Sequence, residues 1–159
     1  YCMEQATDRC KMYCGEKNQM YSALSEELAR MYNAAGRREE SLACHLAVRN
    51  QLLKNGYREG SLLLMVDNNM SVVYLDLGKP EEAIPYLTEA LELTKENGLV
   101  GSAVAEPTWN LARVYRALGD EEKEDIYLKA AVEGFRECYP PEHPKRIAAE
   151  QRLKERQGE

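Results

Sequence analysis

One phrase of this sequence occurs twice, and the repetition restricts the folds that the chain can adopt. Residues 69–83 read NMSVVYLDLGKPEEA, and residues 110–124, which lie 41 positions further on, read NLARVYRALGDEEKE. Three glycines keep nearly the same interval, because Gly36, Gly78 and Gly119 are 42 and 41 residues apart. A fixed period of this length is typical of chains built from stacked copies of one structural unit.

Each of these glycines follows the same helical pattern. A large residue, a small residue and a tyrosine precede it by eight, seven and four positions, which places all three on one stripe of a helix. The sets are Leu28, Ala29 and Tyr32; Met70, Ser71 and Tyr74; and Leu111, Ala112 and Tyr115. We expect the small residue to let a second helix approach closely and the glycine to end the first helix.

A second helix is predicted after each glycine. Pairs of glutamates at 39–40, 81–82 and 121–122 open it, at the positive end of the helix dipole. The pattern predicts a single domain with full units at 15–56, 57–98 and 99–138, a half-unit at 1–14 and a capping helix within 139–159. We expect Pro107 to start or kink its helix and to leave residues 102–106 irregular.

The last 16 residues are basic, whereas the rest of the chain is acidic. The predicted capping helix carries five lysines and arginines, which we expect to form a solvated face, with Ile147, Ala148 and Leu153 turned inward. Overall the net charge is −6, which argues against nucleic acid as a partner because phosphate binding needs clustered cations.

Composition narrows the setting further. The chain is 44% hydrophobic and 30% charged, as expected of a folded domain, and it has no apolar run long enough for a membrane span. Five irregularly spaced cysteines predict reduced thiols and a cytoplasmic protein. Since the sequence opens at Tyr1 and the half-unit lacks its first helix, we expect a fragment of a longer protein.

The repeated pattern resembles the tetratricopeptide repeat (TPR), in the longer form of about 42 residues found in kinesin light chain and bacterial sensor proteins. Residues 110–119 match the first helix of that motif, residues 80–91 match the second, and residues 139–144 resemble the link before a repeat in the kinesin light chain group. The resemblance implies an all-α solenoid of helical hairpins, a right-handed superhelix of about eight helices. It also implies non-enzymatic protein binding.

Three residues depart from the repeat pattern. Ser41 and His45 occupy the positions of Ala83 and Leu87 in the next unit, and Glu124 replaces the small residue in the third. We expect looser packing in the flanking units as a result.

The sequence predicts no catalytic residues, no metal site and no cofactor. His45 lies on a helix between leucines and is interpreted as a buried structural residue, while His143 belongs to the link motif. Cys2, Cys10 and Cys14 share a helical stripe, but three thiols on one element are one ligand short of a zinc site. A metal bound there would revive an enzymatic interpretation.

The resemblance also implies where a ligand binds, because the first helix of each unit lines a concave groove in this family. The residues that it assigns to a peptide-binding groove are Arg30, Asn33, Asn69, Val72, Trp109, Asn110, Arg113 and Arg116. An asparagine amide can donate to and accept from a peptide backbone, and arginines favour acidic ligands, so a protein or peptide partner, acidic in character, is predicted.

Cochaperones of this family grip a chaperone's acidic tail with a clamp of lysine, asparagine and arginine side chains. The matching positions are Glu26, Arg30, Asn69, Glu106 and Asn110, of which only Asn69 agrees. Both glutamates would repel a terminal carboxylate, so we expect no such function.

Two alternatives to peptide binding in the groove stay open. The chain can be a structural spacer or a self-association module that forms a homodimer. It can also be the peptide-sensing regulatory domain of a larger signalling protein.

Overall fold

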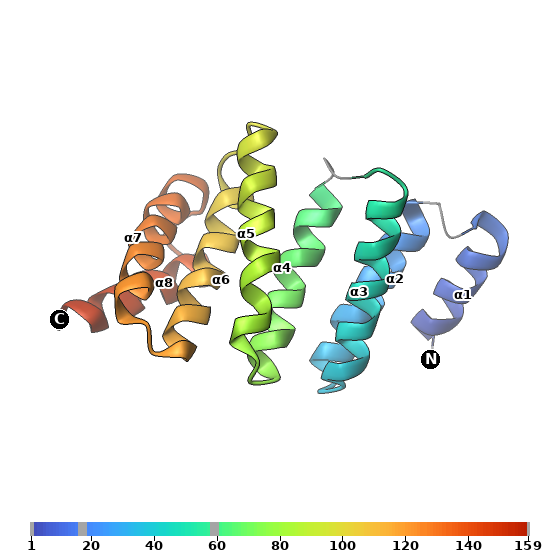
Figure 1. Ribbon diagram of the computed structural model, residues 1–159, viewed down its shortest axis with the longest axis horizontal. Helices are drawn as coiled ribbons and strands as arrows, with labels where there is room; N and C mark the ends of the chain where they lie inside the picture. The colour runs from blue at the N-terminus through green and yellow to red at the C-terminus, as the bar shows by residue number, and fades with distance from the viewer. Residues whose placement is uncertain (1, 16–18, 58–60, 159) are drawn as a thin grey trace. The chain divides into compact units, whose positions relative to one another are not determined.

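The computed structural model describes residues 2–15, 19–57 and 61–158, which fold into α-helices and connecting turns without strands (Figure 1). The helices are α1 (Cys2–Cys14), α2 (Gln19–Ala34), α3 (Arg38–Lys54), α4 (Ser61–Asp76), α5 (Pro80–Glu96), α6 (Ser102–Leu118), α7 (Glu121–Cys138) and α8 (Pro144–Gln157). The predicted all-α fold of helical hairpins is therefore confirmed. None of the described helices is long and apolar enough to cross a membrane.

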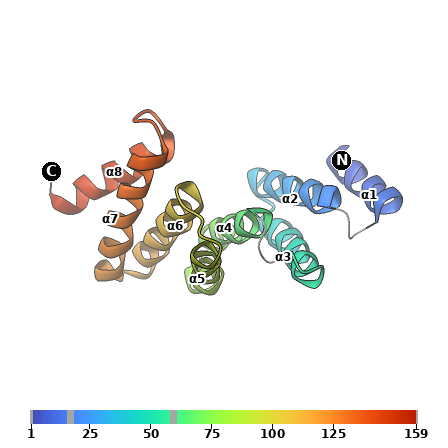
Figure 2. The ribbon, with the colours of Figure 1, turned by 90° about the horizontal axis from the view of Figure 1, so that it is seen from above.

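The helices form two compact units, which are described separately. The first, Tyr1–Gly78, contains α1 to α4, and the second, Lys79–Glu159, contains α5 to α8. In the first unit α2 packs against α1, α3 and α4, and α3 packs against α4. In the second, α6 packs between α5 and α7, and α8 packs against α7 (Figure 2).

Glycines end the first helix of each predicted repeat, as expected. Gly36, Gly78 and Gly119 have positive φ angles of 77°, 70° and 73°. A side chain is strained in this left-handed conformation, so the backbone reverses at glycine, and in all three cases the next helix begins two residues later.

The small residue of the repeated stripe is buried in each repeat, as a close approach of two helices requires. Ala29, Ser71 and Ala112 are at most 2% exposed. The tyrosine of the stripe differs between repeats, because Tyr74 is buried whereas Tyr32 and Tyr115 are half-buried. Each half-buried ring lies beneath a cation from the following turn or helix, Arg37 over Tyr32 and Lys123 over Tyr115.

The prediction of looser packing at the three atypical residues is wrong. Ser41, His45 and Glu124 are at most 3% exposed. Each has a partner for its polar atoms: the Ser41 hydroxyl donates to the backbone oxygen of Ala29 at 2.7 Å, His45 contacts Glu26, and Glu124 accepts from Arg152. Hydrogen bonds thus replace apolar contacts without opening the interface.

The prediction of an irregular segment before Pro107 is also wrong. Helix α6 runs without interruption from Ser102, and Pro107 lies inside it. A proline lacks one backbone donor, but its fixed φ is helical, and burial of the surrounding face stabilises the helix. Pro107 and its neighbour Thr108 are both buried.

The inner face of α8 differs from the prediction as well. Ala149 is fully buried and Leu153 half-buried, whereas Ile147 and Ala148 are exposed. The helix begins at Pro144, where the His143 side chain caps it by accepting from the backbone N–H of Lys145. This start sets the rotation of the helix about its axis, and position 149 turns toward Phe135 and Val132 of the core.

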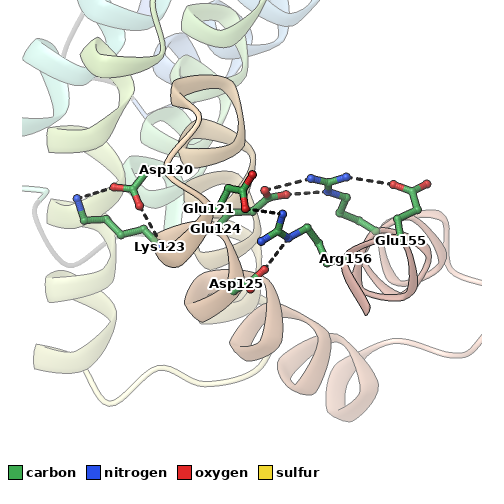
Figure 3. Close-up of polar contacts among 8 residues, drawn as sticks. Asp120, Glu121, Lys123, Glu124, Asp125, Glu155 and Arg156 are labelled. Carbon is green, nitrogen blue, oxygen red and sulfur yellow. Dashed lines mark hydrogen bonds and ion pairs between the residues drawn. The ribbon is translucent and has the colours of Figure 1, made fainter. Parts of the chain in front are cut away.

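The arginines of α8 are not part of a solvated face, as Figure 3 shows for its last turns, whereas Lys145 and Lys154 are exposed as predicted. Arg152 binds Glu124 of α7 and also Glu155, while Arg156 bridges Asp125 and Glu121 of α7. Hydrogen bonding to Arg156 lowers the pKa of the Asp125 carboxyl. The opposite charges of α7 and α8 therefore hold the terminal helix in register.

Candidate functional site

A pocket of about 200 Å³ lies in the first unit, between α2, α3 and α4. Its lining residues are Arg30, Asn33, Ala34, His45, Asn69, Val72 and Val73. Four of the residues predicted for the groove, Arg30, Asn33, Asn69 and Val72, are therefore brought together, two from α2 and two from α4. They meet because α2 and α4 are the first helices of successive repeats and lie in contact.

A buried carboxylate supports the base of this pocket. The Nδ1 atom of His45 lies 2.7 Å from one oxygen of Glu26, and the Asn69 amide donates to the other oxygen at 2.6 Å. Glu26 and His45 are each 1% exposed. An ionised carboxylate can only accept, so Nδ1 of His45 is the donor in this contact, and in the neutral form of the ring Nε2 remains as an acceptor.

The rim of the pocket carries Arg30 and Asn33. The Arg30 guanidinium, which is exposed, donates to Glu27 one turn earlier at 2.8 Å. The Asn33 amide nitrogen lies 3.4 Å from a carboxylate oxygen of Asp76. The Asn33 amide oxygen is buried, and none of the described residues donates a hydrogen bond to it.

Sequence reasoning missed the roles of Glu26 and His45 in this site. Glu26 was interpreted only as a residue that repels a terminal carboxylate, and His45 only as a buried histidine. The available signal was the departure of His45 from the repeat pattern, since a polar residue at a core position requires a polar partner on a facing helix.

The remaining predicted residues lie on α6 in the second unit, and the pocket does not include them. Asn110 is only 4% exposed, and its oxygen accepts from Arg113 at 3.1 Å. Trp109 packs against the core cluster and meets Phe135 edge to face, with ring centroids 6.4 Å apart. Arg116 is exposed in the last turn of the helix. Among the described residues of α6, the arginines are therefore more accessible than Asn110.

Three of the cysteine thiols are held in the protonated form, and the ring of His143 lies against an aromatic side chain. Burial raises the pKa of the Cys10, Cys44 and Cys138 thiols, which lowers the fraction of reactive thiolate. The His143 ring stacks on Tyr139, with centroids 3.7 Å apart. Across residues 2–15, 19–57 and 61–158, no group of three or more His, Cys, Asp or Glu side chains is placed to hold a metal ion. The Cys2 side chain, part of the predicted cysteine stripe, lies outside what the structure describes.

Comparison with solved structures shows the same fold in other proteins. Two crystal structures from Podosopora anserina, described as putative kinesin light chain nearly identical TPR-like repeats, have TM-scores of 0.79 and 0.77, the former for a variant with one substitution. Each is 22% identical, and the match covers 98% of this chain and 76% of the other. BtubC (BKLC) from P. vanneervenii has a TM-score of 0.72 at 19% identity, with 88% and 64% of the two chains covered.

Comparison at the level of sequence identifies the family. A search of curated proteins found no match. The family model described as tetratricopeptide repeat matches residues 18–96 and again residues 61–137, so that the two matches overlap and span all three predicted repeats. The chain therefore belongs to the tetratricopeptide repeat family.

Proposed function

We propose that this chain is a non-enzymatic binding module, and that the pocket of the first unit receives a side chain from an extended segment of a partner protein. TPR folds generally mediate protein–protein interaction. The observation that carries the proposal is the convergence of Arg30, Asn33, Asn69 and Val72 on one pocket. Polar groups that converge beside apolar ones in a concave site are typical of ligand pockets.

The pocket lining supports the binding of a side chain with both polar and apolar parts. Val72, Val73 and Ala34 supply apolar contact, while the side chains of Asn33 and Asn69 supply amide groups. Arg30 at the rim is exposed and can reach the backbone carbonyls of an extended peptide, because a guanidinium has five donors.

For the second unit we propose a preference for acidic ligands, carried by Arg113 and Arg116. Asn110 holds Arg113 by a hydrogen bond, and Arg116 lies one turn further along α6 and is exposed. Trp109 adds an aromatic side chain that is half-buried beside Asn110.

We also propose that the protein is cytoplasmic, because its cysteines are odd in number and irregularly spaced, as in proteins whose thiols stay reduced.

Selection from a displayed library of random 12-residue peptides tests the proposal. The wild type, the pocket variant Arg30→Ala/Val72→Ala and the control Arg38→Ala are compared, because Arg38 is an exposed arginine of α3 that does not line the pocket. We expect the wild type and Arg38→Ala to enrich the same peptides and the pocket variant to bind them at least tenfold more weakly. Equal binding by all three would exclude the pocket as the ligand site.

The homodimer alternative is tested with the same proteins. Sedimentation of the wild type over a hundredfold range of concentration shows whether the chain associates with itself. A dimer that Arg30→Ala/Val72→Ala dissociates would make a second copy the ligand, and the proposal of a separate partner would then be wrong.

A further inference from the structure

We infer that the pocket of the first unit binds a lysine side chain, with its ammonium group on the polar wall formed by Asn33, His45 and Asn69. This inference rests on the proposed function, since it names the chemistry of the side chain that the pocket receives. The first unit would therefore bind a basic side chain, whereas the preference proposed for the second unit is for acidic ligands.

The volume of the pocket limits the ligand to one side chain. Sites for cofactors and drug-sized molecules have volumes of about 300–1,000 Å³. The pocket of about 200 Å³ is smaller and has apolar walls at Ala34, Val72 and Val73. A lysine side chain combines a flexible apolar stem with a compact polar end, so its methylene groups fit such walls.

Acidic groups behind the wall determine which polar atoms remain for a ligand. The Asn69 amide and His45 Nδ1 both donate to Glu26, and the Asn33 amide nitrogen is directed at Asp76. Each of the three side chains thus directs a donor at a carboxylate. The acceptors that these lining side chains retain are the oxygen of Asn69, the oxygen of Asn33 and, in the neutral ring, Nε2 of His45.

The Asn33 oxygen gives independent support for a donor ligand. It is buried, and it accepts no hydrogen bond from the described residues. A buried acceptor without a donor is unfavourable, and a ligand that brings an N–H group relieves this cost. An ammonium group has three donors and no acceptor, which matches a wall of three acceptors.

The charges around the pocket also favour a cation. Glu26 and Asp76 each hold a lining residue from behind, and both are carboxylates. The positive charge of Arg30 is balanced by Glu27, to which it is bonded. A ligand carboxylate would meet Glu26 across a buried hydrogen-bond network, whereas an ammonium group would be attracted to it.

Titration with three small probes of equal chain length tests the inference on the intact chain. Butylammonium, butyramide and butyrate are added at constant ionic strength, and NMR follows the side-chain amides of Asn33 and Asn69 and the ring nitrogens of His45. We expect butylammonium to shift these signals in a saturable way, with butyramide at least fivefold weaker and butyrate without effect. Equal or tighter binding of butyramide or butyrate, or no shift with butylammonium, would overturn the inference.

A pair of variants distinguishes binding of butylammonium in the pocket from the general attraction of cations to an acidic protein. Asn33→Leu removes one wall acceptor and is expected to weaken butylammonium binding at least fivefold, while Asn50→Leu, at an exposed asparagine of α3, leaves it unchanged. Equal weakening by both substitutions would contradict a localised site. The comparison of probes on the wild type stands even if Asn33→Leu fails to fold.

The peptide selection distinguishes this inference from the proposed function. If the pocket variant loses its peptides but those peptides show no enrichment of lysine, the binding module stands and the lysine inference fails. If butylammonium binds the pocket and no peptide is selected, the site for an ammonium group stands and the proposed function fails.

Discussion

Arg152 of α8 donates two hydrogen bonds, of 2.7 and 3.1 Å, to the carboxylate of Glu124 on α7. The Glu124 side chain is 4% exposed, and that of Arg152 is 20% exposed. A carboxylate buried to this extent is tolerated only with a partner that neutralises it and occupies its lone pairs. The contact therefore couples the stability of α7 to the presence of α8.

Loss of this partner should be costly. We expect Arg152→Ala to lower the free energy of unfolding by about 3 kcal/mol, because it leaves a buried charge without compensation. Arg136→Ala is the control, since it removes an arginine that also binds α8 but whose side chain is 55% exposed, and it should change stability little. Urea unfolding followed by circular dichroism measures both. Equal effects of the two substitutions would show that burial of Glu124 is unimportant.

The Glu26 carboxylate beneath the pocket should also contribute to the free energy of unfolding. Glu26→Ala leaves the His45 and Asn69 donors in the first unit without their acceptor, and we expect a loss of about 2 kcal/mol or more in the free energy of unfolding. Glu27→Ala is the matched control on the neighbouring residue, which pairs with the exposed Arg30. A wild-type melting temperature for Glu26→Ala would contradict the buried network.

Close packing of α6 on α7 should restrict position 134. A Cβ atom added at Gly134 would lie 2.8 Å from the Cβ atom of Ala105. Overpacking costs about 1–3 kcal/mol, which exceeds the gain of about 1 kcal/mol in helix propensity, so Gly134→Ala should destabilise the chain.

A compensating substitution tests this steric explanation. Ala105→Gly removes the methyl group that Gly134→Ala meets, so the double variant should be more stable than the sum of the two single effects predicts. Thermal unfolding of the four proteins gives the coupling energy, which we expect to be about 1 kcal/mol. Simple additivity would show that the two positions do not clash.

The ion pairs between α7 and α8 should weaken in acid. Arg156 lowers the pKa of Asp125 from its usual value of 3.8, and Arg136 lowers the pKa of Glu150 from 4.5. A carboxyl whose pKa is lower in the folded state stabilises the fold above its unfolded value and loses that contribution as the pH falls through its folded value.

We therefore expect Arg156→Gln to be less stable than the wild type at pH 7, and the difference to narrow as the pH falls below 3.8. Guanidinium chloride is unsuitable as the denaturant, because it screens the pairs, so urea titrations from neutral pH down to about pH 2.5 make the measurement. A difference in stability that is independent of pH would show that Asp125 does not depend on Arg156.

The helical repeat could be predicted from the sequence because it depends on local signals. Gly36, Gly78 and Gly119 mark positions that need a positive φ, and the stripe before each glycine marks the buried face. Such features depend on the backbone and on periodicity, so they need no knowledge of distant contacts.

What could not be predicted depends on contacts between helices. Glu124 is accommodated at its buried position because Arg152, 28 positions later, lies opposite it, and His45 is accommodated because it contacts Glu26. The interior of α6 tolerates Pro107 for a similar reason, since burial of its face stabilises the helix. Of the candidate site, the resemblance to the family predicted four lining residues of the pocket. It did not predict that Asn110 is buried.

The pairing of Glu124 with Arg152 has a consequence for how this chain can be recombined. The middle repeat has Ala83 at the position of Glu124, and this buried, uncharged residue needs no cation opposite it. In the last hairpin, by contrast, the helix that follows α7 must place a guanidinium opposite the carboxylate of Glu124 to neutralise its buried charge. The repeats of this chain are therefore not interchangeable. Grafting another repeat after α7 requires either an arginine opposite Glu124 or the replacement of Glu124 by alanine.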